Sequence, residues 1–171
     1  RAILYIDGKQ VGIKERTGKR MDSVKISLKQ GETAQLSVLV ENMGRINYGP
    51  MLWDEKGILK GVKIGSQFQF GWQMYSLPCD TADTLNYQPI TEKHSCPAFL
   101  KGSFVLEEAD SDTFVRLDGF HLGRYWNTAG PQKTLYLPAP LLHRGENEIA
   151  VLELESFENP QILLTETQDL G

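Results

Sequence analysis

Two carboxylates near the end of the chain, Glu153 and Glu155, have the spacing of neighbours on one face of a β-strand. Cleavage of a glycosidic bond with retention needs two carboxyl groups about 5–5.5 Å apart, on opposite sides of the bond. Alternate residues of a strand lie about 6.5–7 Å apart, which is close to that distance. Their side chains point the same way, however, so they cannot flank a bond. We interpret both as part of a solvated strand face and predict no catalytic residue in this chain.

The adjacent residues Arg124, Tyr125 and Trp126 are of the types that bind sugars. An aromatic ring stacks on the apolar face of a sugar, and a guanidinium group donates hydrogen bonds to hydroxyls. In a strand, Tyr125 lies on the opposite face from the other two, so the three form one site only where the chain bends. We favour a structural role, closing the end of a sandwich or packing on a neighbouring domain, over sugar contact.

A turn-rich loop after an apolar run holds a second group of polar and aromatic side chains. Gly44 and Gly49 in this loop predict backbone angles that other residues rarely adopt. Amide side chains in such loops most often satisfy nearby backbone groups, so we rank a domain interface second and direct sugar contact third. The candidate residues of this loop are Asn42, Arg45, Asn47 and Tyr48.

Two single tryptophans, Trp53 and Trp72, are expected to be buried in a core or an interface, the usual place for an indole. We include Trp72 among the candidate contacts to a sugar or a domain interface.

Potential metal ligands are scattered along the chain. The carboxylates considered are Asp80, Asp83, Asp110 and Asp112, and none of their loops has a recognisable calcium-binding spacing. His94 lies two residues before Cys96, but a zinc site would need further ligands. We predict no metal and no cofactor. Cys79 and Cys96 are interpreted as free thiols or as one disulfide, and the sequence leaves both open.

The composition excludes several classes of function. The chain has 171 residues, 40% of them hydrophobic, which is enough for a substantial core, and its formal net charge is −4. The densest basic stretch, residues 14–20, also holds a glutamate and a glycine, so a solvated hairpin is favoured over a nucleic-acid surface. No apolar run has the length of a membrane span.

The elements that position these residues are predicted to be strands almost throughout. Ile3–Ile6 and Val11–Ile13 flank an Asp-Gly turn signal and predict a hairpin. Residues 24–28 alternate apolar and polar side chains, which predicts a half-buried strand. Residues 36–40 are apolar nearly throughout, as in a central strand. Residues 68–72 alternate again, although Gly71 interrupts them.

The best strand of the sequence is residues 149–154. Ala150, Leu152 and Leu154 are predicted to share its buried face. Few segments look helical, and 16 glycines and 8 prolines mark turns at short spacing, which favours sandwiches or barrels.

The pattern predicts an all-β fold of two antiparallel β-sandwich units. Between residues 78 and 97 the periodicity fails and three prolines occur, which indicates a linker. We therefore expect a first domain over 1–77, a linker over 78–97 and a second domain over 98–171. The first domain is expected to lack its opening strands, because the sequence begins abruptly at Arg1.

Four motifs occur in order along the chain: VLVENMGRINYG at 38–49, LGRYW at 122–126, GPQKTLYLP at 130–138 and ENEIAVLELE at 146–155. Together they resemble the C-terminal, galactose-binding-like jelly-roll domains of β-galactosidases of glycoside hydrolase family 35. One departure is visible, because the family normally has a further strand of about ten residues before LGRYW. The chain either lacks this strand or the sequence omits a segment.

The resemblance implies a non-catalytic β-sandwich region that packs on a catalytic (β/α)8 barrel of the same polypeptide. The parent enzyme would release terminal β-galactose, and this chain alone would be inactive. The alternative is an independent carbohydrate-binding or lectin-like module that recognises galactosides. No nucleic acid is expected as a partner, and a homo-oligomer is left open. Few cysteines and compact loops favour a bacterial protein of the cytoplasm or cell surface.

Overall fold

The computed structural model describes residues 1–15, 24–42, 44, 46–90, 96–107, 122–125, 133–154 and 160–169. The chain divides into a first unit, Arg1–Met74, and a second unit, Tyr75–Gly171. Every sheet pairing in the described part is antiparallel, and its only helices are two three-residue 3-10 turns, η1 (Ala82–Thr84) and η2 (Ala139–Leu141). The fold is therefore all-β, as predicted, and fits the β-sandwich class.

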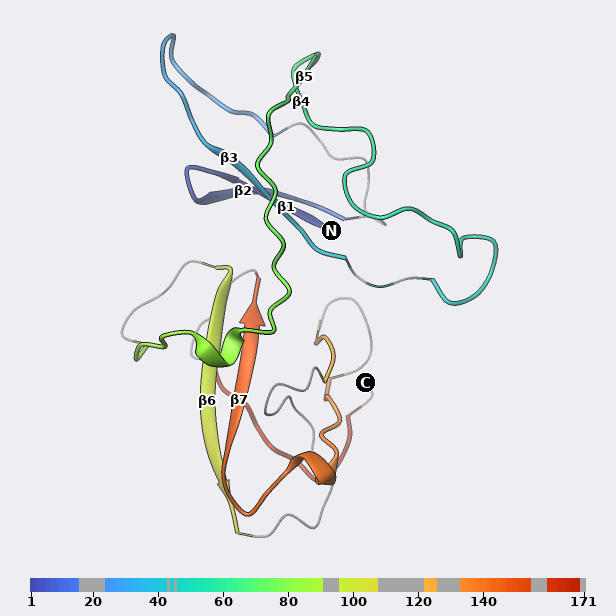
Figure 1. The fold of residues 1–171 in the computed structure, drawn as a ribbon, viewed down its shortest axis with the longest axis vertical. Helices are drawn as coiled ribbons and strands as arrows, with labels where there is room; N and C mark the ends of the chain where they lie inside the picture. Colours follow the sequence, from blue (N-terminus) through green and yellow to red (C-terminus); the bar gives the residue numbers. More distant parts are fainter. Residues whose placement is uncertain are drawn as a thin grey trace. The chain divides into compact units, whose positions relative to one another are not determined.

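The first unit begins with the predicted hairpin of β1 (Ala2–Ile6) and β2 (Lys9–Lys14) (Figure 1). Asp7 and Gly8 form its turn with φ angles of 48° and 77°. Positive φ at both central residues is the geometry of a type I′ turn, which matches the twist of the flanking strands. The Asp7 carboxylate also accepts a 2.8 Å hydrogen bond from the backbone N–H of Gln35, which links the turn to the start of the next strand.

The central strand of the first sheet is β1, because it pairs with β2 on one side and with β3 (Leu36–Val40) on the other. Its side chains Ile3 and Tyr5 are buried. The prediction that residues 36–40 form a central strand is therefore wrong for the described sheet, in which β3 lies at an edge. A continuous apolar run does not distinguish a central strand from an edge strand. The strand β3 has such a run, and its Val40 side chain is still exposed.

Residues 24–28 do not form the predicted strand. Val24 lies against β2, where a Cβ added to Gly12 would come within 2.7 Å of its Cγ2 atom, whereas Ile26 and Leu28 are exposed. The alternating pattern is present but no described strand pairs with it. The turn that follows is as expected, with Glu32 N–H donating to the Lys29 carbonyl at 3.0 Å.

A short hairpin of β4 (Lys63–Ile64) and β5 (Gln67–Phe68) completes the first unit. It ends sooner than the predicted strand over 68–72, although Gln69 N–H still donates to the Val62 carbonyl at 2.9 Å. Gly71, with φ of 74°, turns the backbone away from the extended course beyond this point.

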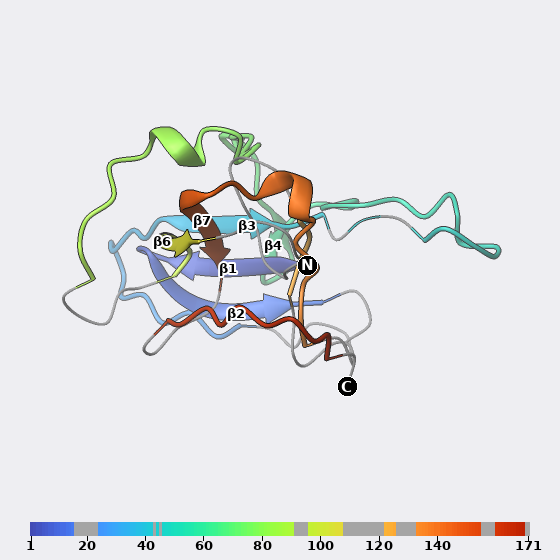
Figure 2. The same ribbon diagram turned by 90° about the horizontal axis from the view of Figure 1, so that it is seen from below.

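The second unit is built on a long antiparallel pair, β6 (Ala98–Leu106) and β7 (Gly145–Glu153). Its buried core consists of Leu137, Leu142 and Ile149, with partly buried apolar side chains packed against them. The extended segment Lys133–Leu135 lies beside the C-terminal stretch, because Lys133 N–H donates to the Asp169 carbonyl at 3.0 Å (Figure 2).

The predicted buried face of β7 is wrong. The side chains that face the core are Ile149 and Val151, whereas Leu152 is 36% exposed; Ala150 is buried as well. The reason is Asn147, which is fully buried at 0% exposure. It lies on the same side of the strand as Ile149 and Val151, so the side that faces the core begins with a polar residue. Its side chain accepts from the His143 N–H at 3.0 Å and donates to the carbonyls of His143 and Gly145.

Part of the stretch predicted as a linker folds against the second unit. Ala82 of η1 is buried, and the Tyr87 hydroxyl donates a 2.8 Å hydrogen bond to its carbonyl. The Lys101 ammonium lies 5.6 Å from the centre of the Tyr87 ring and 2.8 Å from the Glu148 carboxylate. These contacts join the segment after η1 to the face of the β6–β7 pair.

Candidate docking and sugar-contact surface

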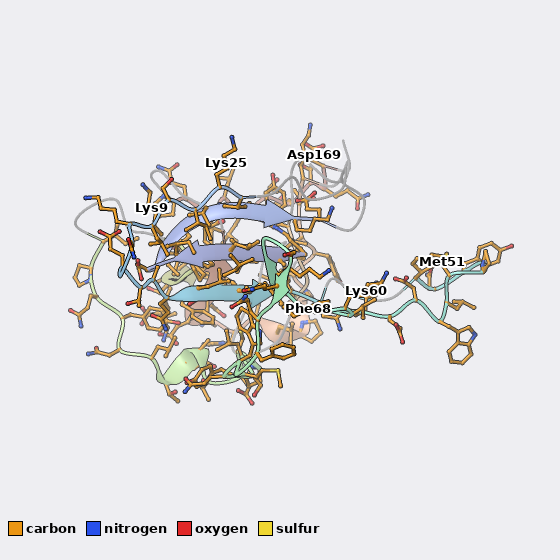
Figure 3. All side chains as sticks on the ribbon, turned by 90° about the horizontal axis from the view of Figure 1, so that it is seen from above. Lys9, Lys25, Met51, Lys60, Phe68 and Asp169 are labelled. Carbon is orange, nitrogen blue, oxygen red and sulfur yellow. The ribbon has the colours of Figure 1, made fainter. Side chains whose placement is uncertain are left out.

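Two candidate residues of the first unit, Asn47 and Tyr48, lie on one projecting segment, residues 46–62, which we call the arm. The arm leaves the end of β3, runs away from the three-stranded sheet, and returns to β4 (Figures 2 and 3). Met51 lies near its tip and Lys60 on its returning limb (Figure 3). Side chains near the tip are therefore held away from the core of their own unit.

The arm has local order that the sequence explains. Gly49 and Gly57 each have φ of 88°, which glycine adopts without steric cost. Between them the Asp54 N–H donates to the Met51 carbonyl at 3.1 Å, and the Asp54 carboxylate lies 3.7 Å from the Lys56 ammonium. The arm thus turns at defined positions.

One polar candidate of this region, Asn42, shows the expected loop chemistry. The Asn42 side chain accepts a 3.3 Å hydrogen bond from the Gly44 N–H, so its amide satisfies a backbone group of the loop. Asn47 is exposed and Tyr48 is 88% exposed. Arg45 lies outside the described residues.

The sequence did not predict that the Trp53 side chain lies at the surface of its unit. It is 88% exposed, so core burial of this side chain is wrong, and burial in an interface stays a prediction. A signal was available, because Trp53 stands between two turn glycines with no strand alternation around it. The other exposed apolar side chains of the arm are Met51, Leu52, Ile58 and Leu59.

Trp72 lies on the segment after β5. Its indole N–H donates a 2.9 Å hydrogen bond to the Gln69 carbonyl, and the side chain is 40% exposed. In the described part of the chain, no hydrogen bond or ring contact joins it to Asn42, Asn47 or Tyr48. The first unit therefore presents these residues in two separate segments. Phe70, Met74, Tyr75 and Leu77 are exposed beside Trp72 in the sequence.

The candidates of the second unit are only partly described. Arg124 and Tyr125 are exposed, and Trp126 lies outside the described residues. The preceding Leu122 packs against the core cluster, which fixes the start of this motif on the second unit. The structure therefore leaves the sugar-binding and structural interpretations of the three residues untested.

The charged groups of the described part show structural roles. The buried Arg1 side chain lies 3.9 Å from the carboxylates of both Glu15 and Glu41, so these acids pair with a guanidinium group.

Burial raises the pKa of the Cys96 thiol, and the nearby Glu153 carboxylate raises this pKa further. Glu155, the other acid considered above, is not among the described residues. Within the ranges that are described, no group of three His, Cys, Asp or Glu side chains is placed to hold a metal ion.

Two family domains match the chain, each over one of its halves. Residues 1–78 match "Beta-galactosidase, first all-beta domain", and residues 97–147 match "Beta-galactosidase, galactose-binding domain". The chain matches the non-catalytic β-domains of β-galactosidases. Three of the four motifs, those at 38–49, 122–126 and 130–138, lie within these matched spans.

Similar β-galactosidases include proteins from plants and animals. The chain is 38% identical to beta-galactosidase 17 of Arabidopsis thaliana over 82% of its own length and 24% of that protein. It is 36% identical to beta-galactosidase-1-like protein 2 of Homo sapiens (86% of this chain, 25% of that protein). It is 32% identical to beta-galactosidase of Macaca fascicularis (99% and 29%). The chain therefore spans about a quarter of the length of the curated relatives it matches.

A search of the described segments for membrane-spanning helices finds no helix of sufficient length and hydrophobicity.

Proposed function

We propose that this chain is the accessory β-sandwich region of a β-galactosidase, packing on and supporting a catalytic (β/α)8 barrel of the same polypeptide. The parent enzyme releases terminal β-galactose, and the barrel supplies both catalytic carboxylates. The observation that carries the proposal is the exposed apolar surface of the first unit, in a chain that matches two non-catalytic β-galactosidase domains.

The physical argument is the cost of leaving such a surface in water. Covering apolar surface stabilises a protein by about 25 cal/mol per Å². Single exposed apolar residues are ordinary, whereas contiguous groups of them mark interfaces. The first unit exposes two groups that are each close in sequence, one on the arm and one over residues 68–74. A large partner domain that remains attached would cover them permanently.

We also propose the domain division expected from the sequence, with domains over 1–77 and 98–171 and a linker over 78–97. The two matched family domains, over 1–78 and 97–147, support it. The contact between Tyr87 and Lys101 supports an attachment of the middle of this linker to the second domain.

A second candidate function is galactoside binding by the second domain. It is favoured by the match of residues 97–147 to a galactose-binding domain and by the exposure of Arg124 and Tyr125. Isothermal calorimetry of the chain with galactose tests it. A millimolar or tighter affinity that Tyr125→Ala abolishes, without a change in thermal stability, would make this module the better description.

The main proposal is tested by hydrolysis of a chromogenic β-galactoside. We expect activity from the full-length polypeptide that contains this chain and none from the 171-residue chain. A full-length variant with its catalytic acids removed, purified in the same way, controls for contaminating enzyme. Activity of the isolated chain above that control contradicts the proposal, as does a full-length polypeptide without activity.

A further inference from the structure

We propose that the arm, residues 46–62, is the element by which the first unit docks on the catalytic domain, and that Trp53 is the anchor of this contact. This inference rests on the proposed function and deepens it, because it assigns the docking to one segment. The rival segment of the same unit is residues 68–74, which also exposes large apolar side chains.

The composition of the arm is that of an interface centre with a polar rim. Its exposed apolar side chains include a tryptophan, a tyrosine and a methionine, residue types that are enriched in the buried centres of protein interfaces. Tryptophan is also among the residues that most often dominate binding energy. Two of the four charged residues of the arm, Asp54 and Lys56, pair with each other at 3.7 Å, so docking of the arm leaves neither of these two charges without a partner. The other two, Glu55 and Lys60, are exposed.

The returning limb of the arm packs on its own unit at its base, which limits the conformations open to the arm. Gly61 lies against the ring of Phe68 in β5, where an added Cβ would come within 3.3 Å of two ring carbons. The φ of Gly61 is 104°, a backbone angle that favours glycine, and the close approach to the ring leaves little room for a Cβ. A segment held in its bound conformation loses less entropy when it docks.

The length of the relatives indicates which domain covers the arm. This chain spans 24% and 25% of two curated β-galactosidases, so about three quarters of such a polypeptide lies beyond the matched part. A domain tethered in the same chain has a high effective concentration at the arm, which a second copy of this chain does not have. We therefore assign the arm to the catalytic domain, and dimerisation through the arm is an outcome of the test.

The test is hydrogen exchange followed by mass spectrometry on the full-length polypeptide and on the 171-residue chain. We expect amides of residues 46–59 to exchange at least about tenfold more slowly in the full-length protein. In full-length Trp53→Asp, we expect these amides to return to the rates of the isolated chain. The galactosidase activity of this variant should also be lost faster on heating.

Two matched variants make the result specific. Leu163→Asp changes an exposed apolar residue of the second unit, and Phe70→Asp changes a residue of the rival segment that is as exposed as Trp53. Both should leave arm protection unchanged. Loss of protection on Phe70→Asp but not on Trp53→Asp would overturn the assignment in favour of the rival segment.

Three further outcomes would also overturn it. The first is an arm that exchanges equally fast in both proteins, and the second is an arm already protected in the isolated chain. The third is a dimer of the isolated chain, detected by sedimentation, that Trp53→Asp dissociates. Failure of the proposed function is a separate result, since a full-length wild-type protein without galactosidase activity disproves that function whatever the arm does.

Discussion

At the scale of single residues, the clearest structural assignment is Asn147. Its buried amide makes hydrogen bonds of 3.0, 2.9 and 3.0 Å to the backbone of His143 and Gly145, just where η2 leads into β7. A side chain so placed sets both the turn and the alternation of the strand that follows. The residue is polar, but its role here is to close a loop.

Asn147→Ala should therefore destabilise the second unit by about 2–4 kcal/mol, because partly buried backbone groups lose their partners and each costs about 1–3 kcal/mol. Urea unfolding followed by circular dichroism measures the change. Asn47→Ala, at an exposed position of the arm, is the control and should cost less than about 0.5 kcal/mol. Equal costs for the two variants would remove Asn147 from this role.

The observed orientation of the β7 side chains leads to a second prediction at the scale of residues. Ile149 is 3% exposed and lies in the core cluster, so Ile149→Ala should cost about 2–5 kcal/mol. Leu152→Ala should cost less, about 1 kcal/mol, since this side chain already contacts solvent. Thermal melts of both variants decide the matter. A larger cost at Leu152 would restore the facing that the sequence alone suggested.

At the scale of elements, the β1–β2 hairpin and the arm show how glycines place the strands and the candidate surface. The hairpin needs positive φ at both turn residues, and the arm needs it at Gly49, Gly57 and Gly61. The sequence pattern identified the Asp-Gly hairpin correctly because its turn chemistry is local. The arm was recognised only as a turn-rich loop, because nothing in its sequence says how far a loop leaves the sheet.

Gly8→Ala should destabilise the first unit by about 1–2 kcal/mol, the cost of a left-handed backbone with a Cβ. No atom lies within 4 Å of the added Cβ, so any loss reports backbone strain alone. Gly102→Ala in β6 is the matched control, because its site is also open and its backbone is not left-handed. There we expect no loss, or a small gain of about 0.4–1 kcal/mol. Chemical denaturation curves for the two variants test the contrast, and a Gly8 variant as stable as the parent would refute it.

At the scale of the whole molecule, the apolar surface of the first unit is the feature that needs a partner. If the catalytic domain covers it, the isolated chain should bind an environment-sensitive apolar dye, and the full-length polypeptide should bind less dye per molecule. Fluorescence titration of both proteins under identical buffer conditions measures this. Equal dye binding would show that the surface stays exposed in the parent protein.

The sequence by itself determined the all-β class, the β1–β2 hairpin and the resemblance to β-galactosidase domains. These features depend on local turn chemistry, on the spacing of glycines and prolines, and on motifs that stand in order along the chain. It also ranked a loop-structural role first for Asn42, and the Asn42 side chain accepts a hydrogen bond from the Gly44 N–H.

Only the tertiary structure decided which side of each strand is buried and which aromatic residues reach the surface. The core face of β7 depends on a side chain, Asn147, whose partners are backbone groups of the preceding turn. The strand position of residues 36–40 depends on which partners lie beside them, and residues 24–28 have the pattern of a strand without a described partner. Exposure of Trp53 depends on the course of the arm. Hydrophobic alternation is a property of one segment, whereas burial is a property of everything packed around it.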